Sequence, residues 1–110
     1  MRQGSIWFDN LNPAEGSEQA GRRPVVIISG DTLNDTLPIV IVCPVTSSIK
    51  SYPTCVALSA NRVNGLKNDS EVITFQIRAI AKRRLYKRMG RISPEQLREI
   101  MKGLFALLTH

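Results

Sequence analysis

The chain has 110 residues, of which 43% are hydrophobic and 22% are charged, and this composition predicts one soluble globular domain over residues 1–110. The same balance argues against a wholly disordered chain, and seven glycines and six prolines without a period argue against a collagen-like or coiled-coil chain. The longest apolar run, residues 39–43, is far too short to span a membrane. Because the sequence also shows no signal peptide, we expect a cytoplasmic protein.

The net charge of +6 is unevenly distributed along the chain. Residues 1–55 hold four cations and five anions, whereas residues 56–110 hold eleven cations and four anions. A basic half is typical of proteins that bind a polyanion, most often nucleic acid or an acidic protein. Solubility alone can also account for a charge of this size.

Short strands separated by turn-rich segments dominate the predicted secondary structure. Strands are predicted at residues 4–8, 25–29, 39–46, 54–58, 71–75, 78–80 and 86–92, with a turn or a single helical turn at 30–38. A long loop is predicted at residues 10–21, and another loop or a tight turn at residues 61–69. Pro44 inside the third strand favours a sheet edge or a bulge, and Cys43 beside it is expected to be a small buried hydrophobe. These elements predict a β-rich α+β fold, a small barrel or compact sheet.

The C-terminal segment changes to helical periodicity. Ser93 can cap a helix, Pro94 suits the first helical position and Gln96 completes a capping box. The apolar residues then recur at the spacing of one helix face, at Leu97, Ile100, Met101, Leu104, Phe105 and Leu108. We therefore predict an amphipathic helix that closes the fold.

Several common catalytic groups are missing from the sequence. The single histidine is His110, and the two cysteines and nine acidic residues have no spacing typical of a zinc or magnesium site. Nucleotide-binding motifs of the Walker and Rossmann types are also missing. If the protein is an enzyme, we expect it to work without a metal or a nucleotide cofactor.

Four segments carry the polar chemistry. Residues 16–24 place an acid, an amide and two arginines before a buried strand, and residues 44–48 end another strand in three hydroxyls that can bond phosphate oxygens. Gln76 and Arg78 alternate onto one face of a predicted strand. Residues 78–91 hold seven cations and no acid, a stretch that can follow a phosphate backbone. Each segment also has a plainer interpretation as a solvated turn, a strand end or an exposed face.

Taken together, these segments resemble the MazF/PemK family of bacterial toxins over nearly the whole chain and in the expected order. The most specific part is residues 16–24 followed by residues 44–47. The matching segments are Gly4-Ser5-Ile6-Trp7, Leu11-Asn12-Pro13, Gly16 to Ser29, Val42 to Ser47, Tyr52-Pro53, Gln76 to Ile80 and Gly90-Arg91-Ile92.

The resemblance implies a small SH3-like (CcdB/MazF-like) barrel that forms homodimers. It implies a metal-independent endoribonuclease that cuts single-stranded RNA at short sequences. The ribose 2′-OH attacks the adjacent phosphate and leaves a 2′,3′-cyclic phosphate and a 5′-OH. It also implies a cognate antitoxin whose acidic C-terminal segment lies across the RNA site, and no cofactor or membrane partner.

The resemblance also assigns site residues. The family's catalytic arginine directly precedes a proline and corresponds to Arg23, and its threonine corresponds to Thr46. A guanidinium can stabilise the negative charge that develops on the phosphate. It is almost never deprotonated at pH 7, so it is a poor candidate for the base. Glu18 is the nearest candidate for a base, or for a residue that positions RNA. Ser17 and Phe75 stand where some relatives carry a histidine and an acid, so mechanisms that need those groups do not transfer. The other expected RNA contacts are Ser17, Gln19, Ser47, Gln76 and Arg78.

Two alternatives stay open. A CcdB-like toxin of the same fold would poison DNA gyrase and cut nothing, but such toxins use a tryptophan near the C-terminus, and the single tryptophan here is Trp7. A non-catalytic nucleic-acid-binding module would retain RNA through the basic stretch alone.

Overall fold

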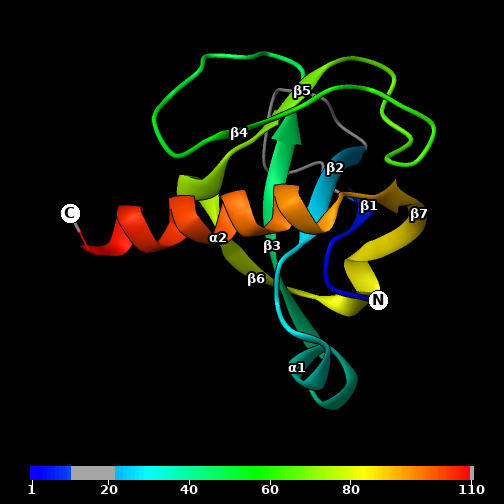
Figure 1. Ribbon diagram of the computed structural model, residues 1–110. Helices are drawn as coiled ribbons and strands as arrows, with labels where there is room; N and C mark the ends of the chain where they lie inside the picture. Colours follow the sequence, from blue (N-terminus) through cyan, green and yellow to red (C-terminus); the bar gives the residue numbers. More distant parts are fainter. Residues whose placement is uncertain (11–21, 110) are drawn as a thin grey trace.

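The chain folds around an antiparallel sheet, seen in a computed structural model that describes residues 1–10 and 22–109 (Figure 1). In these residues, seven strands pair in the order β4-β5-β3-β2-β1-β7, and β6 pairs with β3. The strands are β1 (Ser5–Asn10), β2 (Arg22–Ile27), β3 (Ile39–Thr46), β4 (Val56–Leu58), β5 (Ser70–Val72), β6 (Arg78–Ala81) and β7 (Leu85–Arg91). The helical elements are α1 (Asp31–Thr36), the 3₁₀ turns η2 (Thr74–Gln76) and η3 (Lys82–Arg84), and α2 (Pro94–Thr109).

The expected β-rich fold with a C-terminal helix is confirmed. The strand pairing in the described residues runs from β4 to β7 without joining those two strands, so the sheet is barrel-like but open. None of the helices in this part of the chain is long and apolar enough to cross a membrane.

Strand β3 lies at the centre of the sheet and has the boundaries that the sequence predicts. One side pairs with β2, whereas the other pairs with β6 up to Val42 and with β5 from Val45 onward. Pro44 lies between these two neighbours, and its carbonyl accepts the N–H of Ile73 at 2.9 Å. The expectation that Pro44 marks an edge or a bulge is therefore wrong. Its missing N–H falls where β3 changes partner and the ladder is interrupted.

Two hydrophobic cores lie on opposite faces of the sheet, because successive residues of a strand point to opposite sides. The larger core contains Val26 and Cys43 together with buried residues of α2, and the smaller contains Val25, with Trp7 packed against it. Burial, with a smaller contribution from Cys55, raises the pKa of the Cys43 thiol to about 12. The predicted role of Cys43 as a buried hydrophobe is confirmed, and its thiol stays protonated at neutral pH.

Helix α2 begins as its sequence predicts. The N–H of Gln96 donates to Oγ of Ser93 at 3.1 Å, and the N–H of Ser93 donates to Oε1 of Gln96 at 2.9 Å, so the capping box is formed. Leu104 is buried in the larger core, but Phe105 and Leu108 are 69% and 79% exposed. The helix therefore closes the fold with one part of its apolar stripe and leaves the other part facing outward.

The connection between β4 and β5 docks on β7 through two glycines. Gly65 has a φ of +71°, which favours a residue without a Cβ. A side chain at Gly90 of β7 would collide with the carbonyl oxygen of Val63, so only glycine allows this approach. The same carbonyl accepts the N–H of Arg91 at 3.0 Å. Residues 63–65 are consequently held against β7.

The segment after β5 does not form the predicted strand. Strand β5 ends at Val72, Gln76 ends the 3₁₀ turn η2, and Arg78 begins β6. The prediction that Gln76 and Arg78 alternate on one strand face is therefore wrong. The physical reason lies in the tertiary structure. Thr74 is fully buried at the start of the turn, and its Oγ1 lies 2.8 Å from Oγ1 of Thr54, a partner that a local pattern does not reveal.

Candidate active site

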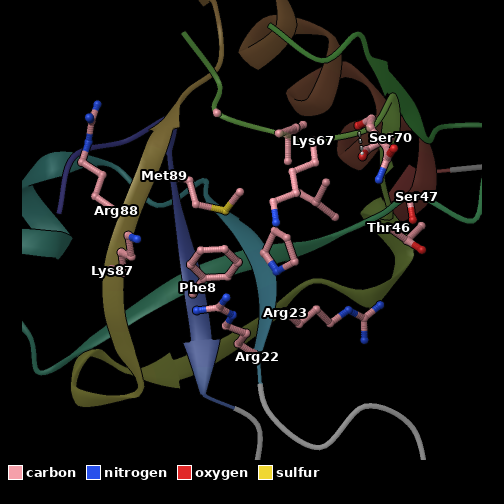
Figure 2. A pocket seen from close by; sticks show the side chains of 15 residues that line it. Phe8, Arg22, Arg23, Thr46, Ser47, Lys67, Ser70, Lys87, Arg88 and Met89 are labelled. Atoms are coloured by element: carbon pink, nitrogen blue, oxygen red, sulfur yellow. Dashed lines mark hydrogen bonds between the residues drawn. The ribbon is translucent and has the colours of Figure 1, made fainter. Parts of the chain in front are cut away.

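A pocket of about 780 Å³ opens among β1, β2, the end of β3, β7 and the connection between β4 and β5 (Figure 2). The described residues that line it include five cations and no acid, so the pocket favours an anionic ligand. Three expected site residues, Arg23, Thr46 and Ser47, meet here. The lining residues are Phe8, Arg22, Arg23, Pro24, Val45, Thr46, Ser47, Gly65, Leu66, Lys67, Asn68, Ser70, Lys87, Arg88 and Met89.

Arg23 enters the pocket from β2, where it is half-buried. Its backbone pairs with Asp9 of β1, and on the other side of β2 lies β3, whose last residue is Thr46. Figure 2 shows Arg23 on the same side of the pocket as Thr46 and Ser47. The sheet therefore brings together a guanidinium and a hydroxyl that are distant in the sequence.

Thr46 can act as a hydrogen-bond donor in the pocket. Its Oγ1 accepts the N–H of Ser48 at 3.0 Å, which fixes the side chain at the point where β3 ends. Because this bond uses a lone pair, the hydroxyl hydrogen can be directed at a ligand in the pocket. The exposed Ser47 supplies a second hydroxyl beside it.

A buried carboxylate accepts hydrogen bonds from the loop that follows Thr46 and stabilises it. Glu71 of β5 pairs with Thr46 and is only 4% exposed. Its Oε1 accepts the N–H of Lys50 at 3.0 Å, and its Oε2 accepts the N–H of Ser51 at 3.1 Å. These charge-assisted bonds fix residues 50 and 51, and with them the course of the chain beyond the pocket.

We expect Glu71→Gln to loosen this loop, because a carboxamide oxygen can accept one N–H while its NH₂ group faces the other. The free energy of unfolding should fall by about 1–2 kcal/mol. Proteolysis within residues 47–51 should become faster. Urea unfolding and limited proteolysis measure the two effects, with Glu99→Gln on the exposed face of α2 as the control. Unchanged values for both would show that other contacts hold the loop.

Two arginines of the basic stretch are bound to Asp9 of β1, whose side chain is fully buried. Arg84 donates from Nε to Oδ1 and from Nη2 to Oδ2, both at 2.9 Å, and Arg78 donates from Nη2 to Oδ2 at 3.2 Å. The Arg78 side chain is 42% exposed, but neither Arg78 nor the exposed Gln76 lines the pocket. Neither of these two expected RNA contacts therefore lines the pocket that holds Arg23 and Thr46.

The remaining expected contacts, Ser17, Glu18 and Gln19, lie outside the described residues and stay predictions. Within residues 1–10 and 22–109, no three His, Cys, Asp or Glu side chains gather as metal ligands do. What the described site can do is bind a phosphate. A guanidinium fork and a hydroxyl donor at one side of a cationic pocket match its non-bridging oxygens.

Comparison with known protein families decides which family this is. The family model for the PemK-like, MazF-like toxin of type II toxin-antitoxin systems matches residues 2–108. The chain belongs to the PemK/MazF toxin family. The resemblance seen in the sequence motifs is therefore confirmed over nearly the full length.

Similar proteins agree with this family. Endoribonuclease MazF9 of Mycobacterium tuberculosis is 42% identical over 110 residues, covering 94% of this chain and 92% of the relative. Endoribonuclease MazF of Staphylococcus saprophyticus is 38% identical over 102 residues, covering 91% of this chain and 84% of the relative. Among solved structures, MazE-MazF (Form-II) from Deinococcus radiodurans matches this MazF-family chain with a TM-score of 0.82 at 30% identity, covering 98% of this chain and 95% of that chain.

Proposed function

We propose that this chain is the toxin of a type II toxin–antitoxin system and acts as a sequence-specific, metal-independent endoribonuclease on single-stranded mRNA. Membership of the PemK/MazF family and two relatives named endoribonucleases support the activity. The structural observation that carries the proposal is the meeting of Arg23 and Thr46 in one cationic pocket.

The proposed reaction is an internal transfer of the phosphate. The ribose 2′-oxygen forms a bond to phosphorus, the bond from phosphorus to the 5′-oxygen breaks, and the proton of the 2′-OH leaves while the 5′-oxygen gains one. The products are a 2′,3′-cyclic phosphate and a 5′-OH. Negative charge builds on the non-bridging oxygens, where Arg23 acts as the clamp and Thr46 adds a hydrogen bond. Glu18 stays a candidate for the base or for a residue that positions RNA.

The proposal includes two protein partners. A cognate antitoxin would place an acidic C-terminal segment across the RNA site, and the solved complexes of related chains include a mycobacterial endoribonuclease bound to its cognate antitoxin. A second copy of this chain would form a homodimer, and the exposed apolar Phe105 and Leu108 of α2 supply surface that a partner can cover. An mRNA substrate implies a cytoplasmic protein.

Cleavage of a mixed-sequence RNA by the purified protein in excess EDTA tests the proposal. We expect cleavage to continue, and the fragments to carry 2′,3′-cyclic phosphate and 5′-OH ends. A matched oligonucleotide with a single 2′-deoxyribose at the cleaved position should stay intact, because it lacks the nucleophile. Loss of activity in EDTA, or fragments with 5′-phosphate ends, would contradict the proposal.

The same preparation distinguishes the two alternatives. A CcdB-like toxin would inhibit DNA supercoiling by gyrase and leave RNA intact. In this chain Trp7, the single tryptophan, packs against the smaller core, which does not favour that function. A non-catalytic module would retain RNA without cutting it, and Thr46→Ala would not change that retention.

A further inference from the structure

The loop that follows Thr46 is attached at both of its ends to one residue, Glu71. At the start of the loop, the backbone of Glu71 in β5 pairs with Thr46 in β3. At the end of the loop, the Glu71 carboxylate accepts the N–H groups of Lys50 and Ser51, at 3.0 and 3.1 Å. Residues 47–49 therefore form a short connection whose two ends are fixed by the same buried residue.

The chain after Thr46 adopts an unfavourable backbone conformation. Among the non-glycine residues that the structure describes, only Ser51 and Thr54 have a positive φ, of +58° and +74°. Residues with a Cβ rarely adopt this left-handed region, and a β-branched residue does so least readily. Thr54 is held by the contact of its Oγ1 with Oγ1 of Thr74, and Ser51 by its bond to Glu71. Such strain persists only where the surrounding structure enforces it, and it is typical of functional sites.

Glu71 lies in the same row of the sheet as the two groups that act in the proposed reaction. Strand β2 pairs with β3 at Val25 and Pro44. Arg23 and Thr46 each lie two residues farther along these strands, so their side chains fall on the same face as that pair. Arg23, Thr46 and Glu71 therefore share one side of the sheet across β2, β3 and β5. The connection that Glu71 fixes consequently lies beside the proposed site.

The course of this connection determines how the Thr46 hydroxyl is oriented. Oγ1 of Thr46 accepts the N–H of Ser48 at 3.0 Å, so the hydrogen bond depends on where residue 48 lies. If that N–H moves away, the hydroxyl can rotate and donate to a nearby backbone carbonyl, as threonine hydroxyls at strand ends often do. The hydroxyl hydrogen is then no longer directed at a ligand in the pocket.

We propose that Glu71 is a positioning residue for Thr46. By holding Lys50 and Ser51, it keeps Ser48 against Oγ1 of Thr46 and so keeps the hydroxyl hydrogen directed at the reacting phosphate. The inference rests on the proposed function, because it assumes that Thr46 donates to that phosphate. Glu71 is not among the described residues that line the pocket, so it acts on the rate through Thr46 and not through contact with RNA.

A double-mutant cycle on RNA cleavage in EDTA tests this role. Glu71→Gln keeps the size of the side chain but turns an NH₂ group toward one of the two N–H groups. We expect the maximal single-turnover rate to fall about tenfold and the half-saturating enzyme concentration to change little, because a misplaced donor weakens the transition state more than binding. In a Thr46→Ala background the same change should cost less than about twofold, because the hydroxyl that it positions is already gone. Enzyme in excess over RNA keeps the slow background measurable.

Asn34→Ala is the matched control for a loss of stability. Asn34 is a buried polar residue of α1, 2% exposed, and it donates to the carbonyl of Ser29 at 2.9 Å. Helix α1 precedes the start of β3, whereas Thr46 lies at the far end of that strand (Figure 1). The control variant should be less stable in urea but stay within about twofold of the wild-type rate. All rates are measured at a temperature at which urea unfolding shows every variant to be folded.

Three results would overturn the positioning role. The first is a Glu71→Gln variant that loses no more activity than Asn34→Ala. The second is an equal proportional loss from Glu71→Gln in the wild-type and Thr46→Ala backgrounds, which would mean that Glu71 acts independently of the hydroxyl. The third is a higher half-saturating concentration with an unchanged maximal rate, which would assign Glu71 to RNA binding. In each case wild-type protein that cuts RNA keeps the proposed function, whereas wild-type protein that cuts no RNA would overturn that function and this inference with it.

Discussion

Replacing Arg23 with alanine is expected to lower the single-turnover rate of RNA cleavage at least about a hundredfold, the effect of removing one preorganised donor from a developing charge. Arg23 lies half-buried at the start of β2, on the side of the pocket that carries Thr46. In this partly dried position its fork of N–H groups interacts strongly with phosphate oxygens. The rate is measured with enzyme in excess over one defined RNA, in EDTA.

Two further variants test whether the effect comes from the Arg23 guanidinium itself. Arg23→Lys keeps the charge without the planar fork, so we expect it to restore only part of the rate. Arg22→Ala removes a neighbouring guanidinium whose Cζ lies 4.6 Å from the centre of the Phe8 ring. That change should weaken binding and lower the rate by less than about tenfold. An Arg23→Ala variant that folds normally and stays within tenfold of wild type would contradict the assigned role.

The second large effect is on stability. We expect Arg84→Ala to lower the free energy of unfolding by about 3 kcal/mol, because it leaves a buried carboxylate without its bidentate partner. Asp9 has no exposed side-chain surface, and Arg84 makes two of the three charged hydrogen bonds that Asp9 accepts from residues 22–109 as described. Arg78→Ala removes a single longer bond from a side chain that is 42% exposed, so its cost should be about 1 kcal/mol. Urea unfolding at constant protein concentration measures both.

A double-mutant cycle identifies Asp9 as the cause. If the loss in Arg84→Ala comes from the carboxylate left behind, the same change made in an Asp9→Ala background should cost at least about 1 kcal/mol less. Losses that simply add would mean that Arg84 stabilises the protein through contacts other than Asp9.

The parts of the fold that the sequence predicted correctly depend on local chemistry. The capping box at Ser93 and Gln96 needs only neighbouring residues, and it appears as expected. Strand β3 is apolar from Ile39 to Val45 and ends at the polar Thr46, so its boundaries could be predicted from composition. Local patterns did not reveal that β3 changes partner at Pro44, because a strand's neighbours are set by the rest of the chain.

The sequence predicted part of the site, and it missed the features that depend on contacts between distant residues. Arg23, Thr46 and Ser47 were assigned from the order of motifs, and the structure brings them into one pocket. Gln76 was expected on a strand face, but the chain turns there, at the buried Thr74. Residues whose roles depend on contacts 69 and 75 positions apart, such as Asp9 with Arg78 and Arg84, carry no signal in a local pattern.

The basic stretch shows the same limit. Its seven cations look alike in the sequence, yet the fold gives Arg78 and Arg84 to Asp9 and places Lys87 and Arg88 in the pocket. The alternation of a single strand could not predict which cations go where, because the stretch is not a single strand. The 3₁₀ turn η3 interrupts it between β6 and β7.

The central claim is that Arg23 and Thr46 act together on one phosphate, and a double-mutant cycle on the cleavage rate tests it most directly. Single-turnover rates are compared for wild type, Arg23→Ala, Thr46→Ala and the double variant on one RNA in EDTA. Groups that serve one transition state lose activity non-additively, so the double variant should be only slightly slower than the slower single variant. Full activity in either single variant, or two losses that multiply without coupling, would contradict the claim.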